Sequence, residues 1–328
     1  METTAVATRT QSNNPIVKFV RAYLSQLLVL AFLIIVVSLS SPYFLTRGNI
    51  TNIVRQISTN LYMGCALTII MITGGIDLST SSVLALGGMV AALITERAGG
   101  PFLLALVAAL ASGAVVGLIN GFIVSRTTIP PFIVTYTMQS VIRGAVYIIT
   151  DANVVRLYNT QFLAFGSGFF WIIPLPVIYL IVVVTATQII LKHTKLGRRM
   201  YAVGGNERCA QYAGINIKMT RMFIYVTSGV MATLAGLVLT SRTTSMQPTL
   251  GVGLEMDAIA AVVLGGTSMR GGQGAVIGTV IGALIIGIIN NGLNLMGINS
   301  FYQYIVKGIA ILLAVYVDYI KQQSMIKR

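Results

Sequence analysis

Long apolar runs fill this sequence almost from end to end, and they constrain its fold more than any other feature. A membrane-spanning helix needs roughly 20 mostly apolar residues to cross about 30 Å of hydrocarbon. Of the 328 residues, 55% are hydrophobic and 9% are charged, and the mean hydropathy is +0.85. A soluble domain carries about a quarter charged residues. The sequence therefore predicts an all-α integral membrane protein.

The apolar runs predict about ten transmembrane helices. They are expected over residues 22–40, 52–73, 79–95, 101–125, 131–150, 169–191, 222–241, 257–266, 273–295 and 302–319. The third and eighth are short, so eight or nine spans remain possible. The eighth is bordered by the glycine pairs 265–266 and 271–272, which indicate a half-helix that enters and leaves a protein-lined cavity.

Lysines and arginines set the expected orientation. Residues 192–221 contain seven of them against one acid, Glu207, and so carry +6 of the net charge of +14. Such positive loops stay in the cytoplasm. Both chain ends are also basic, which places them inside, with six spans before the loop and four after it. Two bundle halves are expected, over residues 22–191 and 222–320, joined by a cytoplasmic coupling loop at 192–221. A cytoplasmic arm (1–21) precedes them and a basic tail (321–328) follows.

Several function classes are disfavoured by the residues that the sequence contains. Basic stretches are not interleaved with aromatic residues that stack bases, so the positive charge indicates contact with anionic lipid and not with nucleic acid. One histidine, His193, cannot supply a zinc or iron ligand set. The phosphate-binding loop G-x-x-x-x-G-K-[ST] does not occur, so ATP, if used, is hydrolysed by another chain. An intramembrane enzyme is less favoured because no paired nucleophile and base is found.

Self-similarity indicates an internal repeat. An offset of 191 residues places Gly74-Gly75 on Gly265-Gly266, and transporters use such repeats to surround a midplane site. Apolar sequence rich in glycine and alanine also matches itself easily, and this alternative stays open. Glycines spaced by four predict close helix contacts; they are Gly113, Gly117, Gly121, Gly278 and Gly282.

Three acids border apolar spans without a neighbouring cation in the sequence: Asp77, Glu255 and Asp257. Ionisable groups at such positions are costly and mark transport pathways. Asp77 or Ser79 is also placed to cap the helix that follows; we favour this structural role slightly, and the two roles can coexist. Glu255 and Asp257 either line a gate or cavity or lie at the membrane interface, with Arg242 as a partner.

Amide side chains are the second set of polar groups inside apolar helices: Asn120, Asn290, Asn291 and Asn294. An unpaired amide is costly there. Each therefore bonds a neighbouring helix or lines a wet cavity, and helix bonding is the favoured interpretation.

A short helix is predicted inside the basic loop. Asn206 is a suitable N-cap, residues 207–213 form the helical run, and Gly214 ends it. An isolated helix of this length is only marginally stable in water. We therefore expect it to dock against another surface.

Four stretches together resemble the permease subunits of bacterial carbohydrate ABC importers, typified by ribose, galactose, arabinose and xylose permeases. They are GGIDLS (74–79), LGRRMYAVGGNERCAQYAGINI (196–217), MDAIAAVVLGGTSMRGGQG (256–274) and NNGLNLMGINSFYQYIVKG (290–308). The pattern resembles ribose permeases most, although Thr80-Ser81-Ser82 stands where they tend to carry Val-Gly-Ser. This departure leaves the identity of the sugar open.

The resemblance implies a bacterial inner-membrane importer with divided labour. A second permease copy or a paralogue completes the pathway, an extracytoplasmic binding protein captures the sugar, and a separate ATP-binding subunit holds ATP and magnesium. The chain itself is then no enzyme and binds no cofactor. The short cytoplasmic helix becomes the segment that docks on the ATPase, through Asn206, Glu207, Arg208, Ala210, Gln211, Ala213 and Gly214. An ion-coupled secondary transporter with Asp77 as its ion site is the alternative.

Overall fold

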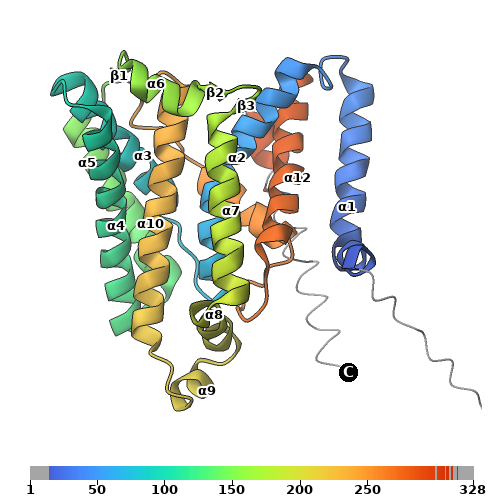
Figure 1. Cartoon of the computed structure of the whole chain (residues 1–328), viewed down its shortest axis with the longest axis vertical. Coiled ribbons are helices and arrows are strands. Elements are labelled where there is room, and N and C mark those ends of the chain that lie inside the picture. The colour runs from blue at the N-terminus through green and yellow to red at the C-terminus, as the bar shows by residue number, and fades with distance from the viewer. Residues whose placement is uncertain (1–14, 300, 307, 310–311, 313–315, 317–328) are drawn as a thin grey trace, which may run out of the picture.

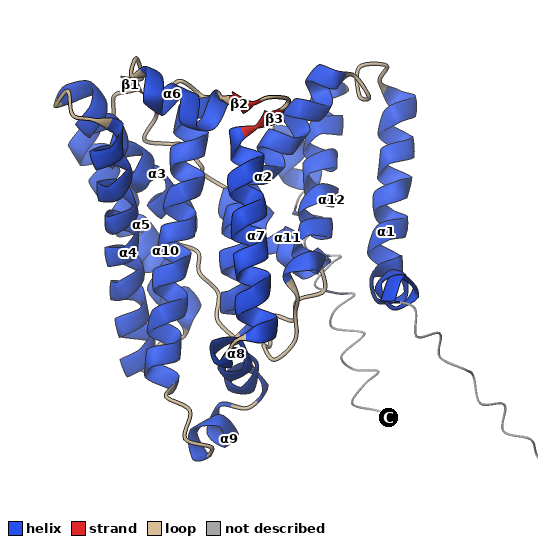
Figure 2. Ribbon diagram, viewed as in Figure 1, coloured by secondary structure: helices blue, strands red, loops and turns tan. Residues whose placement is uncertain are grey.

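Long helices run side by side between two ends of the molecule (Figure 1, Figure 2). The computed structural model describes residues 15–299, 301–306, 308–309, 312 and 316. Its helices are α1 (Pro15–Ser40), α2 (Arg47–Ile72), α3 (Thr80–Ala92), α4 (Phe102–Arg126), α5 (Pro131–Thr150), α6 (Thr160–Ser167), α7 (Leu175–His193), α8 (Lys195–Gly205), α9 (Glu207–Tyr212), α10 (Ile217–Arg242), α11 (Leu254–Leu264) and α12 (Val276–Leu295). The prediction of an all-α membrane protein is confirmed.

Six of the described helices are long and apolar enough to cross a membrane: α1 from Val20, α4, α5, α7, α10 and α12. Helix α2 is as long as α1 but carries more polar residues. It packs against α7, α10, α11 and α12, and every residue from Ile57 to Ile72 is buried. The polar side chains of this stretch therefore face protein and not lipid, which explains how a less apolar helix is accommodated at the centre of the bundle.

The two short spans are short in the structure as well. Helix α3 has 13 residues and continues as a π-helical turn (Leu93–Arg97), while α11 has 11 residues. At 1.5 Å per residue α11 covers roughly half the hydrocarbon thickness. The pairs Gly74-Gly75 and Gly265-Gly266 follow the ends of α2 and α11. The internal repeat stays a prediction. Most of the tenth span, 302–319, lies outside the described residues.

One predicted boundary is wrong. The sixth span was expected from residue 169, but α7 begins at Leu175. Residues before it form a small antiparallel pair, β2 (Phe169–Phe170) with β3 (Ile173–Pro174). Pro174 and Pro176 account for the difference, because proline lacks an amide donor and is suited to a helix start and not to its interior. The apolar run was therefore longer than the helix.

Small residues bring helices into close contact where their spacing predicted it. On α4, a Cβ added to Gly117 would overlap the backbone carbonyl of Tyr225 on α10. On α12, a Cβ at Gly282 would overlap the carbonyl of Ala261 on α11. Only glycine permits these approaches. They fix α10 and α11 against their neighbours and thereby position the polar groups described below.

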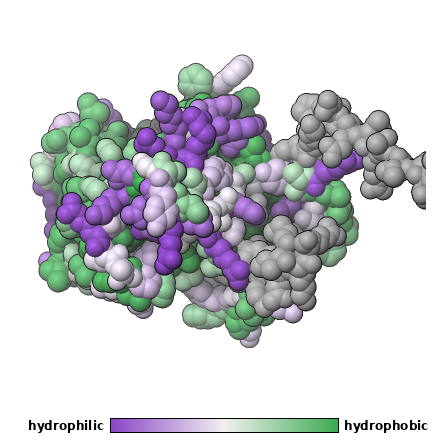
Figure 3. All heavy atoms as spheres, turned by 90° about the horizontal axis from the view of Figure 1, so that it is seen from below, coloured by the Kyte–Doolittle hydropathy of each residue, from purple (hydrophilic) through white to green (hydrophobic). Residues whose placement is uncertain are grey.

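The two ends of the bundle differ. At one end lie α6 and a second antiparallel pair, β1 (Val155–Arg156) with β4 (Ser245–Met246). At the other end lie α8 and α9 (Figure 1). Seen from that second end, hydrophilic residues gather over the middle of the face and hydrophobic residues form much of its rim (Figure 3). This distribution agrees with a face that leaves the membrane.

Candidate functional site

Asp77 lies in the extended segment between α2 and α3 and is 2% exposed. Its Oδ1 accepts hydrogen bonds from the Ser79 backbone N–H at 2.9 Å and from the Ser79 hydroxyl at 2.6 Å. Its Oδ2 accepts a hydrogen bond from the Ser228 hydroxyl of α10 at 2.8 Å. The carboxylate is therefore held by three neutral donors and connects the break after α2 with α10.

The predicted cap is not formed in the expected way. Ser79 holds the N-cap position of α3, but its side chain accepts no hydrogen bond from the first helical turn. Its backbone is in the α region (φ −71°, ψ −12°), whereas capping favours extended backbone. Asp77 instead bonds the N–H two residues ahead of it, which is an Asx-turn. Asp77 thus holds the turn that leads into α3.

Asn120 of α4 joins this cluster. Its Nδ2 donates to the Ser79 hydroxyl at 2.9 Å, and both residues are buried. Among the described residues, its Oδ1 has no hydrogen-bond partner, and the buried hydroxyl of Tyr225 on α10 also lacks one. Asp77, Ser79 and Asn120, which the sequence marked separately, are therefore brought together.

The other three amides bond different segments. Asn290 of α12 donates to Asp257 Oδ2 at 3.2 Å, and Asn291 exchanges two hydrogen bonds with Asn49 of α2, at 2.8 and 3.0 Å. Asn294 accepts a hydrogen bond from Gln303 at 2.8 Å. Each of the four amides thus bonds another segment of the chain, and two of the partners, Asp257 and Asn49, lie in other helices.

Glu255 and Asp257 lie in the first turn of α11 and are buried. Glu255 Oε1 accepts a hydrogen bond from Gln139 of α5 at 3.2 Å, while its Oε2 has no partner among the residues that the structure describes. Arg242, the partner proposed from the sequence, donates instead to the carbonyl of Arg55 at 3.2 Å. That pairing was wrong, because α10 ends beside α2 and not beside the start of α11.

Sequence reasoning missed Arg143 of α5. Its guanidinium donates to the carbonyls of Pro248 at 2.7 Å, Leu250 at 2.9 Å and Ser81 at 3.1 Å. It thereby ties α5 to α3 and to the loop that precedes α11. The available signal was a lone arginine inside an apolar span, since such a group needs buried partners.

The short helix of the basic loop, α9, has the predicted N-cap and the predicted glycine after its C-terminus. Asn206 Oδ1 accepts a hydrogen bond from the Cys209 N–H at 3.0 Å, and Gly214 has a φ of +78°. The helix ends at Tyr212, one residue earlier than expected. Ala210 is buried, so it faces the protein and does not contribute to an exposed docking face. Arg208, Gln211, Tyr212 and Ala213 are exposed.

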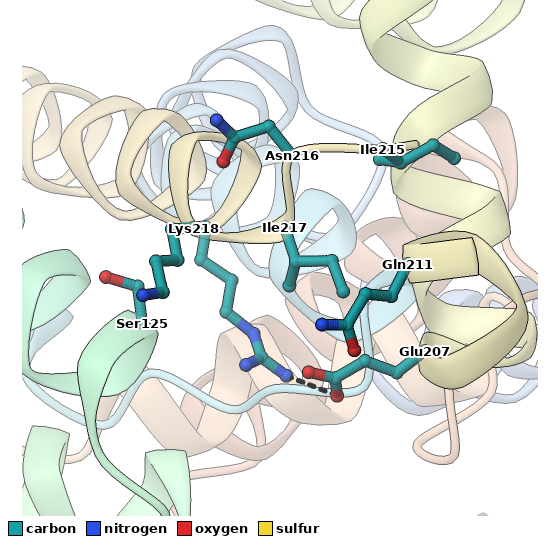
Figure 4. A pocket seen from close by; sticks show the side chains of 8 residues that line it. Ser125, Glu207, Gln211, Ile215, Asn216, Ile217 and Lys218 are labelled. Atoms are coloured by element: carbon teal, nitrogen blue, oxygen red, sulfur yellow. Dashed lines mark hydrogen bonds and ion pairs between the residues drawn. The ribbon is translucent and has the colours of Figure 1, made fainter. Parts of the chain in front are cut away.

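A cavity of about 290 Å³ separates α9 from the ends of α4 and α10. Glu207 and Arg221 form an ion pair of 2.7 Å across it (Figure 4). Ser125, Gln211 and Lys218 also line it. The ion pair joins the small helix to the start of α10. Ser228 lies further along the same helix, near its middle.

Helix α8 was not predicted. It begins after Thr194, whose hydroxyl accepts a hydrogen bond from the Gly197 N–H at 3.2 Å. Its far end reaches the bundle core, because a Cβ at Gly204 would overlap the carbonyl of Ile72 at the end of α2. The Gly272 N–H donates to the same carbonyl at 2.8 Å. The basic loop, the end of α2 and the loop after α11 therefore meet at one point.

Residues 49–315 match the family described as the permease component of the branched-chain amino acid transport system. The chain belongs to this permease family. The ribose import permease protein RbsC of Escherichia coli (strain K12) is 45% identical to it over 314 residues, which cover 93% of this chain and 97% of RbsC.

Other relatives also align over most of their length. RbsC of Bacillus subtilis (strain 168) is 45% identical over 298 residues, 90% of this chain and 92% of that protein. The L-arabinose transport system permease protein AraH of Escherichia coli (strain K12) is 34% identical over 298 residues, 91% of this chain and 90% of AraH. No solved structure matches the permease. The resemblance to carbohydrate importer permeases is confirmed, and the chain is a multi-pass membrane subunit and not an enzyme.

Proposed function

We propose that this permease forms the membrane pathway of an ATP-driven importer for a monosaccharide, with a ribose-like sugar favoured. The observation that carries the proposal is 45% identity to RbsC over 97% of that protein. The permease family implies an ATPase subunit and a binding protein as partners. ATP and magnesium then bind to the ATPase and not to this chain. None of the relatives reported above favours the alternative of an ion-coupled secondary transporter.

The polar groups of the bundle agree with a neutral, hydroxyl-rich solute. Asp77 is fully engaged with neutral donors and has no cationic partner among the described residues. Three buried acceptors, Asn120 Oδ1, Glu255 Oε2 and Asn290 Oδ1, have no hydrogen-bond partner in the part of the chain that the structure describes. Hydroxyl groups donate to such oxygens. We propose that the residues facing the pathway are drawn from Asp77, Ser79, Asn120, Glu255, Asp257, Asn290, Asn291 and Asn294.

We propose that residues 192–221 are the cytoplasmic coupling loop between two bundle halves, 22–191 and 222–320. The seven basic residues of the loop support this placement, with both chain ends, 1–21 and 321–328, on the same side of the inner membrane. Arg208, Gln211 and Tyr212 then face the ATPase, while Asn206, Ala210 and Gly214 shape the helix. A second permease copy or a paralogue completes the pathway, and anionic lipids contact the basic face.

The test of this function is sugar uptake in the cells that carry the gene. The gene is deleted, and uptake of labelled ribose, allose, arabinose, xylose and galactose is compared with that of the parent strain. We expect loss of uptake for one or a few of these sugars, restored when the permease is expressed from a plasmid. Unchanged uptake of every sugar in the panel would contradict the proposal.

A further inference from the structure

A second cavity, of about 550 Å³, lies at the α8 end of the bundle between α1, α7, α8 and α12. Its polar lining comes from Lys192, Arg198, Gln188 and two tyrosines, Tyr23 and Tyr201. Leu191 and Ile277 supply apolar lining. The cavity thus combines positive charge with apolar surface at the α8 end of the three apolar helices α1, α7 and α12.

Two of these residues are cations that form no ion pair with any described residue. Lys192 is in the last turn of α7 and Arg198 is in the first turns of α8, and both side chains are exposed. Within the described part of the chain the single ion pair is that of Glu207 with Arg221, and the lining of this cavity contains no acid. Two adjacent uncompensated cations attract an anion.

The walls of the cavity are fixed by local structure. Helix α1 breaks at Tyr23 (φ −117°, ψ 15°), and the Tyr23 ring lies beside Gly278, where an added Cβ would be 3.2 Å from the ring Cε1. The Tyr201 hydroxyl donates to the carbonyl of Gly274 at 2.8 Å. The tyrosines therefore hold positions set by the backbone of the segment that starts α12.

Helix α1, which supplies Tyr23 to the cavity, also exposes apolar side chains. Beyond Tyr23, α1 exposes Leu24, Leu28 and Phe32, at spacings of four residues. Such spacing places them along one side of the helix. A phosphate ion would use the two cations and leave this apolar side without a partner, whereas a phospholipid uses both.

We propose that the cavity binds an anionic phospholipid, with its phosphate between Lys192 and Arg198 and its acyl chains along α1. Basic pockets between transmembrane helices suit such headgroups. The proposal rests on the proposed function in one respect: the proposed orientation places the cavity at the cytoplasmic leaflet, which then supplies the lipid. Lipid binding is measured without transport, so its outcome is separate from that of the uptake experiment.

The test uses the purified full-length permease in neutral detergent and native mass spectrometry. Phosphatidylglycerol, phosphatidylcholine and inorganic phosphate are titrated separately. We expect phosphatidylglycerol to remain bound and the other two to bind far more weakly. At about 1 kcal/mol for each basic residue, the Lys192→Gln/Arg198→Gln variant should bind phosphatidylglycerol roughly 30-fold more weakly.

The matched control is Lys195→Gln/Arg199→Gln. It removes the same charge from exposed positions of α8 that do not line the cavity, and we expect affinity near that of the parent protein. Conservative Lys192→Arg should also keep the affinity, because it keeps the charge at this position, and thermal unfolding of each variant checks that it is folded. Equal losses in both double variants, equal binding of phosphatidylcholine, or equal binding of inorganic phosphate would each overturn the proposal.

Discussion

Asp77 and Ser228 are 151 residues apart in the sequence and are joined by a buried hydrogen bond of 2.8 Å. This bond connects the non-helical break after α2 to the middle of α10. Because Asp77 also holds Ser79, and Ser79 accepts a hydrogen bond from Asn120, one carboxylate organises three segments. Helix α10 continues from Ser228 back to Arg221, which pairs with α9.

The role of Asp77 predicts unequal effects of two substitutions. Asp77→Asn keeps one oxygen for the Ser79 N–H, and the Ser228 hydroxyl can accept from the new amide. Asp77→Ala leaves buried donors without partners, at about 1–3 kcal/mol for each. We expect Asp77→Asn to retain much of the thermal stability and uptake, and Asp77→Ala to lose both, measured at matched expression. Equal, near-complete loss of uptake in the two variants would contradict a turn held by neutral donors.

The contact between α8 and α2 predicts a sharp difference between adjacent glycines. An added Cβ at Gly204 would overlap the Ile72 carbonyl, whereas one at Gly205 has nothing within 4 Å. Gly204→Ala should therefore lower the stability by roughly 1–3 kcal/mol and reduce uptake. Gly205→Ala is the matched control and should behave like the parent protein. Thermal unfolding and uptake are measured for both, and indistinguishable variants would refute the tight contact.

The exposed face of α9 predicts where the ATPase binds. The Tyr212 side chain is 91% exposed, so Tyr212→Asp should leave permease stability within about 0.5 kcal/mol while reducing ATPase association. The measurement is co-purification of the ATPase subunit in detergent. Tyr158→Asp is the control, because Tyr158 is also largely exposed but lies at the opposite end of the bundle. If both variants retain the ATPase equally well, α9 is not its docking segment.

Ala210 gives a different outcome from the one expected of an exposed docking residue. It is 4% exposed, so a bulky charged side chain there would displace α9 from the bundle. Ala210→Glu should therefore reduce both thermal stability and ATPase association. Loss of association with unchanged stability would indicate that Ala210 itself faces the ATPase.

The proposed orientation predicts which residues react from each side of the membrane. Cys209 is exposed and Cys65 is buried, so Cys209 is the thiol that an impermeant maleimide can reach. It should react only in inverted vesicles. In a Cys209→Ser background, Ala98→Cys and Asn153→Cys should react in intact spheroplasts, since both positions are exposed at the other end. Reaction of Cys209 in sealed spheroplasts would reverse the orientation.

Local patterns in the sequence predicted most helices and the ends of α9, because these depend on residues close together in the chain. Asn206 and Gly214 are examples. Helix α8 was missed because glycines and arginines suggested a loop, while its stability comes from burying Met200 and Val203. The start of α7 was misplaced because hydropathy alone does not distinguish an apolar hairpin from a helix.

The sequence identified residues of the candidate site but not how they are arranged in space. Buried polar residues in apolar spans were identified by their cost in that environment, and this reasoning found Asp77, Asn120 and Asn290. Their partners Ser228, Ser79 and Asp257 depend on how distant helices pack, which one sequence does not specify. The wrong pairing of Arg242 and the missed contacts of Arg143 have the same cause.

Transport by the purified proteins tests the central claim most directly. The permease, its ATPase subunit and its binding protein are reconstituted in proteoliposomes with labelled ribose and ATP supplied on the ATPase side. We predict ribose accumulation that requires all three proteins and ATP and that is unaffected by a protonophore or by removal of sodium. Accumulation by the permease alone, driven by a proton or sodium gradient without ATP, would contradict the account.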